Sequence, residues 1–141
     1  MKILLATDGS KHSIHAVKFA IRLLGETVSP GSITLISVHD DTSLRHAQRF
    51  VGKKAVDEYL RDLSENDLAE ARKILDKAEI KHVMMIRRGH VAAEIADAGS
   101  SGKFDMIVMG SKGRSGLKDL LVGSVAQRVV ELSKIPVVLV R

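Results

Sequence analysis

The chain has 141 residues, of which 45% are hydrophobic and 28% charged, and this balance excludes a disordered or low-complexity protein. It has no cysteine and only 3% aromatic residues, which excludes a disulfide framework and a thiolate metal site and argues against a base-stacking surface for nucleic acid. Lys and Arg number 22 against 17 Asp and Glu, and the resulting net charge of +5 favours phosphate-bearing ligands or other polyanions without choosing between them.

The first part of the chain predicts two strands separated by a helix. Residues 2–7 read KILLAT, a continuous apolar run typical of a buried strand. The run breaks at Asp8, too early for a signal peptide or a membrane span, so we expect a cytoplasmic protein without membrane contact. Apolar residues at helical spacing predict a helix over 14–24, and residues 32–38 (SITLISV) predict a second strand because they are rich in β-branched side chains.

The middle of the chain is predicted to be mainly helical. Residues 39–54 are polar and weakly patterned, and we expect them to form mostly loop. Residues 56–78 carry apolar side chains at helical spacing, with a break where Ser64 is placed to cap a second segment. A third strand is predicted over 82–87 (HVMMIR), followed by a short helix over 91–98 that the sequence GSSG should end.

The last part of the chain completes an α/β fold. Residues 105–109 (DMIVM) predict a fourth strand, a glycine-rich loop follows, and a helix is expected over 124–133. A fifth strand is predicted over 136–140 (PVVLV). Strands that alternate with helices indicate a parallel sheet covered on both faces. The prediction is one domain over residues 1–141, a doubly wound five-stranded parallel sheet in the order 3-2-1-4-5.

Two polar segments are expected to meet at one edge of this sheet. In the order 3-2-1-4-5, the sheet reverses between the first and fourth strands, and ligands of open parallel sheets bind outside the carboxyl ends of the strands at such a point. The first strand leads into Asp8, and the fourth leads into Gly110. We therefore expect Asp8 to face the glycine-rich loop across one crevice.

The glycine-rich loop has the properties of a phosphate cradle. It reads GSKGRSGLKDLLVGS from Gly110 to Ser124. Gly113 and Gly116 permit positive φ angles and keep side chains away from a ligand. Serine hydroxyls, the charges of Lys112 and Arg114 and the free N–H groups at the start of the next helix would attract an anion. The chain contains neither a Walker loop nor a G-x-G-x-x-G motif.

The spacing of this loop resembles a known signature. Gly110-x-x-Gly113, nine residues and then Gly123–Ser124 is similar to the G-2x-G-9x-G-[ST] pattern of ATP-binding universal stress proteins. The likeness extends over essentially the whole chain, including the segments KILLATDGS and DMIVMGSKG. The resemblance implies a 3-2-1-4-5 sheet, homodimerisation through the last strand from Pro136 to Val140, and adenine-nucleotide binding.

The resemblance also implies a role for each matching residue. Asp8 would contact the adenosine near its ribose or base, and Val38 would meet adenine through its backbone. The fourth strand and its loop would supply the remaining contacts: Met109 and Gly110 at the ribose, Gly113, Gly123 and Ser124 at the phosphates, and Ser111 and Ser115 in support. The chain departs from the family at Ala6 and Val91, where many members carry proline.

Simpler explanations exist for the same residues. Asp8 could cap the first helix or shape an Asx turn. Ser124 and Gln127 match a capping box, S-x-x-Q, that needs no ligand. Lys112 and Arg114 could be solvated loop charges. These alternatives stay open at the level of sequence.

The sequence offers little reaction chemistry. It shows no nucleophile–base pair, and His39 with the two aspartates after it lacks the convergent partners of a metal site. The expected cofactor is ATP, or ADP or AMP, with or without Mg²⁺ or Mn²⁺, and the expected activity is at most slow ATP hydrolysis. The leading hypothesis is a nucleotide-loaded homodimer that signals to an unidentified protein partner. The rivals are a stress-response dimer without nucleotide and an adenylate-transferring enzyme, for which no substrate domain is visible.

Overall fold

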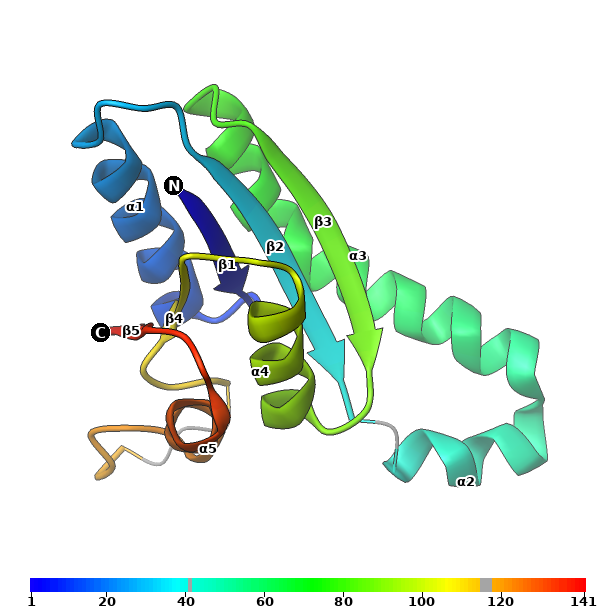
Figure 1. The fold of residues 1–141 in the computed structure, drawn as a ribbon. Helices are drawn as coiled ribbons and strands as arrows, with labels where there is room; N and C mark the ends of the chain where they lie inside the picture. The colour runs from blue at the N-terminus through cyan, green and yellow to red at the C-terminus, as the bar shows by residue number, and fades with distance from the viewer. Residues whose placement is uncertain (41, 115–117) are drawn as a thin grey trace.

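The computed structural model describes residues 1–40, 42–114 and 118–141, and it confirms the predicted sheet (Figure 1). All strands are parallel and lie in the order β3-β2-β1-β4-β5. Their bounds are β1 (Lys2–Ala6), β2 (Ser32–His39), β3 (His82–Arg88), β4 (Met106–Gly110) and β5 (Val137–Val140). In this register Leu4 of the central strand lies opposite Thr34 on one side and Ile107 on the other.

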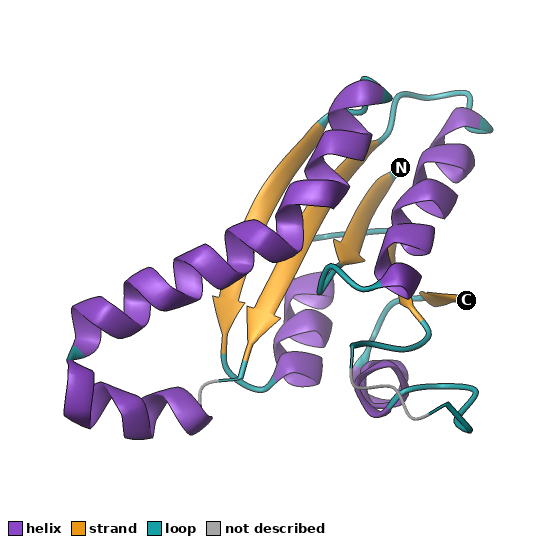
Figure 2. Ribbon diagram, turned by 180° about the vertical axis from the view of Figure 1, so that it is seen from behind, coloured by secondary structure: helices purple, strands orange, loops and turns teal. Residues whose placement is uncertain are grey.

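Helices cover both faces of the sheet, as expected. Helices α1 (Lys11–Gly25) and α3 (Lys53–Lys77) lie on one face, in front of the sheet in Figure 2, and α4 (Val91–Ser101) and α5 (Ser124–Leu132) lie on the other. The fully or almost fully buried side chains include Leu5, Val17 and Leu68 on the first face and Ile36, Ile95 and Val129 on the second. Burial on both faces explains the continuous apolar runs of the strands. Within the described ranges, no helix is both long and apolar enough to cross a membrane.

The prediction of loop over residues 39–54 is wrong. His39 ends β2, and Thr42–Val51 form helix α2, which packs against α3. Asp40 Oδ1 accepts the N–H of Thr42 at 2.8 Å and so satisfies a donor at the start of this helix. Leu44 and Ala47 are half-buried one turn apart. Leu44, Ala47 and Val51 recur at helical spacing, but most residues of the segment are polar, and the loop prediction follows from that polarity.

Helix α3 is continuous over 25 residues, so the predicted break at Ser64 is wrong. Ser64 and Asp67 are buried in the middle of the helix, and the apolar stripe continues beyond them at Leu68 and Ala71. Tertiary packing here outweighs the modest helix propensity of Ser and Asp. Packing also outweighs helix propensity in α4, which continues through Gly99. A Cβ atom on Gly99 would lie only 2.8 Å from Cδ1 of Ile107 in β4, so glycine lets the helix pack closely on the sheet.

Candidate functional site

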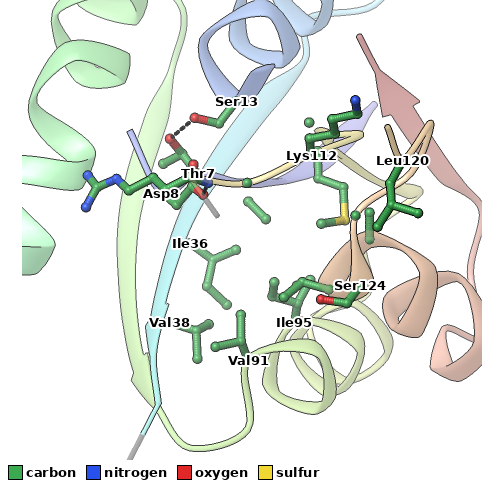
Figure 3. A pocket seen from close by; sticks show the side chains of 18 residues that line it. Thr7, Asp8, Ser13, Ile36, Val38, Val91, Ile95, Lys112, Leu120 and Ser124 are labelled. Carbon is green, nitrogen blue, oxygen red and sulfur yellow. Dashed lines mark hydrogen bonds between the residues drawn. The ribbon is translucent and has the colours of Figure 1, made fainter. Parts of the chain in front are cut away.

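A cleft of about 350 Å³ opens at the carboxyl ends of β1 and β4, where the strand order reverses (Figure 3). Residues from β1, β2, β4, α4 and the glycine-rich segment after β4 line it. Seven of the nine residues predicted for the site lie in this lining: Asp8, Val38, Met109, Gly110, Gly113, Gly123 and Ser124. The turn after the first strand and the segment after the fourth therefore do converge on one crevice.

Asp8 joins two loops through its carboxylate. Its Oδ1 accepts the N–H of Ser10 at 2.9 Å, which forms an Asx turn, and its Oδ2 accepts the N–H of Arg114 at 3.2 Å. Asp8 does not cap α1, because the N-cap residue is Ser10, whose Oγ accepts the N–H of Ser13 at 3.4 Å. The carboxylate thus ties the glycine-rich segment to the turn after β1, at the wall of the cleft.

One wall of the cleft is apolar. Ile36 and Val38 come from β2, and Val91 and Ile95 come from α4, and their side chains point into the same space (Figure 3). Met109 of β4 adds a buried side chain to the same lining. A flat apolar group would be removed from water between these side chains.

The main chain at Val38 gives this wall a polar edge. Thr7 donates its N–H to the carbonyl of Ile36 at 3.0 Å, so Ile36 faces β1, and Val38, two residues on, faces the same way. The pairing of β1 with β2 ends at Ala6 and Ile36. The N–H and C=O of Val38 therefore lie beyond the end of β1 and place a donor and an acceptor at the apolar wall.

The start of helix α5 forms the opposite part of the cleft. Gly123 is its N-cap residue, in an extended conformation, and no side chain of the described residues caps this helix. The alternative of a capping box is excluded, because Ser124 is the first helical residue and Gln127 donates its N–H to the Gly123 carbonyl at 3.0 Å. The first N–H groups of a helix have no partner within it. Those of Ser124, Val125 and Ala126 belong to residues that all line the cleft.

Three glycines of the segment are explained by close neighbours. A Cβ on Gly110 would lie 2.7 Å from the carbonyl carbon of His12, and one on Gly113 would lie 2.9 Å from Asp8 Oδ2. Gly123 is less crowded, with a main-chain carbon at 3.3 Å. None of the three has a φ angle in the left-handed region, so close neighbours and not a positive φ explain glycine at these positions.

The two serines expected to assist at the phosphates are not in the described lining. Ser111 is buried, donates its N–H to the carbonyl of Val140 and accepts the N–H of Gly123, both at 2.7 Å. Its Oγ lies 3.5 Å from Nδ1 of His12. Ser111 therefore joins both ends of the glycine-rich segment to β5. Ser115 and the neighbouring Gly116 lie outside the described residues.

Lys112 and Arg114 both line the cleft, and Arg114 is also paired with a residue of α3. The Arg114 guanidinium donates to Oδ1 of Asp67, an α3 side chain that is 5% exposed. Oδ2 of Asp67 also lies 3.4 Å from Nε2 of His39. Burial raises the pKa of the Asp67 carboxyl above its usual range, although Arg114 and His39 act to lower it, and Asp8 raises it further. The sequence gives no signal for this pair, whose members are 47 positions apart.

Several other lining residues also escape sequence reasoning. Ile36 and Ile95 read as ordinary core positions of a strand and a helix. Thr7 Oγ1 donates to Ser13 Oγ at 3.1 Å (Figure 3), and Ser13 donates to the Ser10 carbonyl at 2.8 Å. These two hydroxyls in the lining are thus bonded to neutral oxygens and not to a base. In the part of the chain that the structure describes, no three His, Cys, Asp or Glu side chains are grouped to hold a metal.

The fold and the cleft define a doubly wound α/β protein with a ligand site at the switch point of its sheet. Residues 1–141 match the Universal stress protein family, and the chain belongs to that family, as the sequence resemblance predicts. It is 32% identical to universal stress protein MJ0531 of Methanocaldococcus jannaschii, over 99% of this chain and 81% of the relative. The solved structure of hypothetical protein MJ0577 of the same organism has a TM-score of 0.85 and 28% identity, over 99% and 94% of the two chains. A universal stress protein of Archaeoglobus fulgidus, solved in complex with dAMP, shares the fold with a TM-score of 0.65 at 18% identity, over 100% and 98%.

Proposed function

We propose that this protein binds an adenine nucleotide, with ATP as the main ligand, and acts as a nucleotide-loaded homodimer in stress-response signalling. The observation that carries the proposal is the uncapped start of α5, whose first N–H groups belong to residues of a cleft with an apolar wall. A phosphate at this place would satisfy those donors and gain from the helix dipole. The dAMP complex of the Archaeoglobus fulgidus relative supports the choice of an adenine nucleotide.

The lining suggests one orientation for the nucleotide. Adenine would lie against Val38 and the α4 side chains, with the Val38 N–H and C=O as its polar partners. The ribose would lie beside Asp8, Met109 and Gly110. The phosphates would reach Gly113, Gly123 and Ser124, with Lys112 adding charge. A cleft of about 350 Å³ is within the range of ~300–1,000 Å³ that is usual for small-ligand sites.

The chain's own groups favour binding over cleavage of ATP. Phosphoryl transfer requires a residue that orients the attacking water, and usually a metal ion. Asp8 supplies the carboxylate of the lining, and both of its oxygens already accept main-chain N–H groups. A Mg²⁺ or Mn²⁺ ion that arrives with the nucleotide would have Asp8 as its nearest acidic neighbour in the lining. We therefore expect hydrolysis to be slow or absent, which suits a nucleotide-dependent switch.

The nucleotide proposal is tested by thermal unfolding with and without ATP. Ligand at ~100 times its Kd adds about 2.7 kcal/mol to the free energy of unfolding, which raises Tm by roughly 5–10 °C at this chain length. Ser124→Pro removes one N–H and one hydroxyl at the first helical position, where proline is tolerated, so it should reduce the ATP shift with little change in the ligand-free Tm.

The matched control for this variant is Lys11→Pro. It likewise removes the N–H of the first residue of a helix, α1, outside the cleft lining, and should keep the full ATP shift. If the parent Tm stays constant in millimolar ATP and Mg²⁺, and the denatured protein releases no nucleotide, the rival function is favoured: a stress-response dimer that binds no nucleotide.

The homodimer proposal rests on the edge of β5. This strand is the last in the sheet, and its four apolar residues are only half-buried. The carbonyls of Pro136 and Val140 accept hydrogen bonds from the β4 side, so by alternation Leu139 turns its N–H toward the open edge. An exposed apolar edge is normally covered. A second copy of β5, paired antiparallel about a twofold axis, would cover it.

Leu139→Pro and Leu139→Ala separate edge pairing from side-chain packing. The proline removes the outward N–H and leaves the ladder to β4, as edge strands allow, whereas the alanine keeps the N–H and shortens the side chain. Light scattering should give about twice the 15.3 kDa chain mass for the parent and the alanine variant, and a lower mass for the proline variant. A parent that is monomeric at high micromolar concentration would contradict the homodimer.

A further inference from the structure

Asp67 lies where α3 meets both the turn after β1 and the glycine-rich segment. Its carboxylate contacts Arg114 from that segment and His39 from the end of β2, and the carboxylate of Asp8 acts on it as a nearby like charge. The side chain is 5% exposed. A carboxylate at this depth stays ionised only with such partners.

Gly9 makes room for the pairing. A Cβ on Gly9 would lie 2.9 Å from Nη2 of Arg114 and 3.4 Å from Cα of Asp67, and the φ angle of Gly9 is +77°. The turn after β1 therefore lets the guanidinium pass close to its backbone and reach α3. Since the main-chain N–H of Arg114 also donates to Asp8, this residue is held by its side chain and its backbone together.

The ionised carboxylate of Asp67 costs stability in spite of its pairing. Desolvation dominates the environment of Asp67 and raises its pKa, so the ionised carboxylate disfavours the folded state at neutral pH. The Arg114 side chain is 58% exposed, so solvent screens its attraction for the carboxylate and the pairing does not offset the cost of burial. A buried charge retained at a net cost to folding, beside a ligand cleft, indicates a functional role.

We propose that Asp67 is a positioning residue of the nucleotide site: through Arg114 it holds the glycine-rich segment so that the main chain of Gly113 faces the phosphates. This inference rests on the proposed function, because it concerns the same cleft. Gly113 precedes Arg114 and lines the cleft, and a Cβ there would lie 2.9 Å from Asp8 Oδ2, so a small shift of Arg114 moves the cleft wall. Helix α3 thereby contributes to nucleotide affinity without lining the cleft.

The first test compares ATP affinity in four variants: Asp67→Asn, Arg114→Met, the double variant and Asp57→Asn. Asp67→Asn and Arg114→Met should each raise the Kd for ATP about tenfold, on the order of one lost charge-assisted hydrogen bond, and the double variant should add little. Asp57→Asn is the matched control, because it disrupts another α3 ion pair, Asp57 with Arg88 at 3.2 Å, outside the cleft lining. It should leave the Kd unchanged.

The ligand-free Tm separates positioning from a structural role. Asp67→Asn should leave Tm unchanged or raise it at neutral pH, while ATP affinity falls. A variant that binds ATP as tightly as the parent would overturn the inference. Tighter binding would overturn it as well, because Asp67 would then be withholding Arg114 from the ligand.

Limited proteolysis tests positioning without nucleotide. Trypsin cleaves after Lys112, inside the glycine-rich segment, and cleavage there should be several-fold faster in Asp67→Asn than in the parent or Asp57→Asn. Equal rates would overturn the positioning role even if the parent binds ATP. A parent that binds no ATP would instead overturn the proposed function, and the cleavage rates would still decide whether Asp67 holds the segment.

Discussion

Replacing Gly110 by alanine would place a methyl group where the end of β4 touches the first turn of α1. The new Cβ would lie 2.7 Å from the carbonyl carbon of His12 and 2.8 Å from the nitrogen of Ser13. Ordinary carbon contacts are ~3.5–4.0 Å, so β4 and α1 would have to separate by on the order of 1 Å. Both elements are anchored in the core, and overpacking of this kind costs about 1–3 kcal/mol.

For a chain of this length, that loss of free energy lowers Tm by roughly 3–12 °C. Circular dichroism would follow thermal unfolding, with urea unfolding as a second measure. The control is Gly25→Ala at the end of α1, because Gly25 is not in the left-handed region and the new Cβ would meet nothing within 4 Å. That change should leave Tm unchanged or slightly higher, since alanine restricts the unfolded chain. A Gly110→Ala variant as stable as the parent would refute the argument from close contact.

Two further predictions concern the buried polar residues of α3. Ser64 has a buried hydroxyl without a hydrogen-bond partner among the described residues, so Ser64→Ala should raise the free energy of unfolding by about 1 kcal/mol in urea, and a clear loss would contradict this. Burial raises the pKa of Asp67 from its usual 3.8, against the opposing effects of Arg114 and His39 and with Asp8 acting in the same direction. Stability is therefore lost as pH rises from about 4 through the raised pKa. Asp67→Asn should gain stability relative to the parent over that range and then keep a constant advantage, and the opposite trend would exclude burial as the dominant effect.

Local sequence patterns predict most of the fold. Runs such as residues 3–6 are apolar throughout because both faces of the strand are buried, and the alternation of strands with helices leaves few possible topologies. The position of Asp8 opposite Gly110 then follows from the order of the strands. Helix α2 is missed because its segment is mostly polar, although Leu44, Ala47 and Val51 recur at helical spacing.

Local sequence patterns do not predict contacts between residues that are far apart in the chain. Ser124 matches a capping motif, yet Gly123 occupies the cap position, where its N–H is held by the carbonyl of Ser111. Asp67 reads as a helix surface charge and Arg114 as a loop charge, and only the folded chain brings them together through the space above Gly9. The prediction is therefore good for the location of the cleft and poor for the residues that support it.

The pair of helices α2 and α3, which extends beyond the sheet in Figure 1, offers a practical handle on the molecule. Gly52, between the two helices, is exposed with φ +85°, and a Cβ there would meet nothing within 4 Å. Insertions are best tolerated at such tips. At ~1.5 Å per helical residue, Gly52 lies about 22 Å along α3 from Asp67. A fluorophore or short epitope placed there would report on α3 from a distance and leave the mouth of the cleft unobstructed.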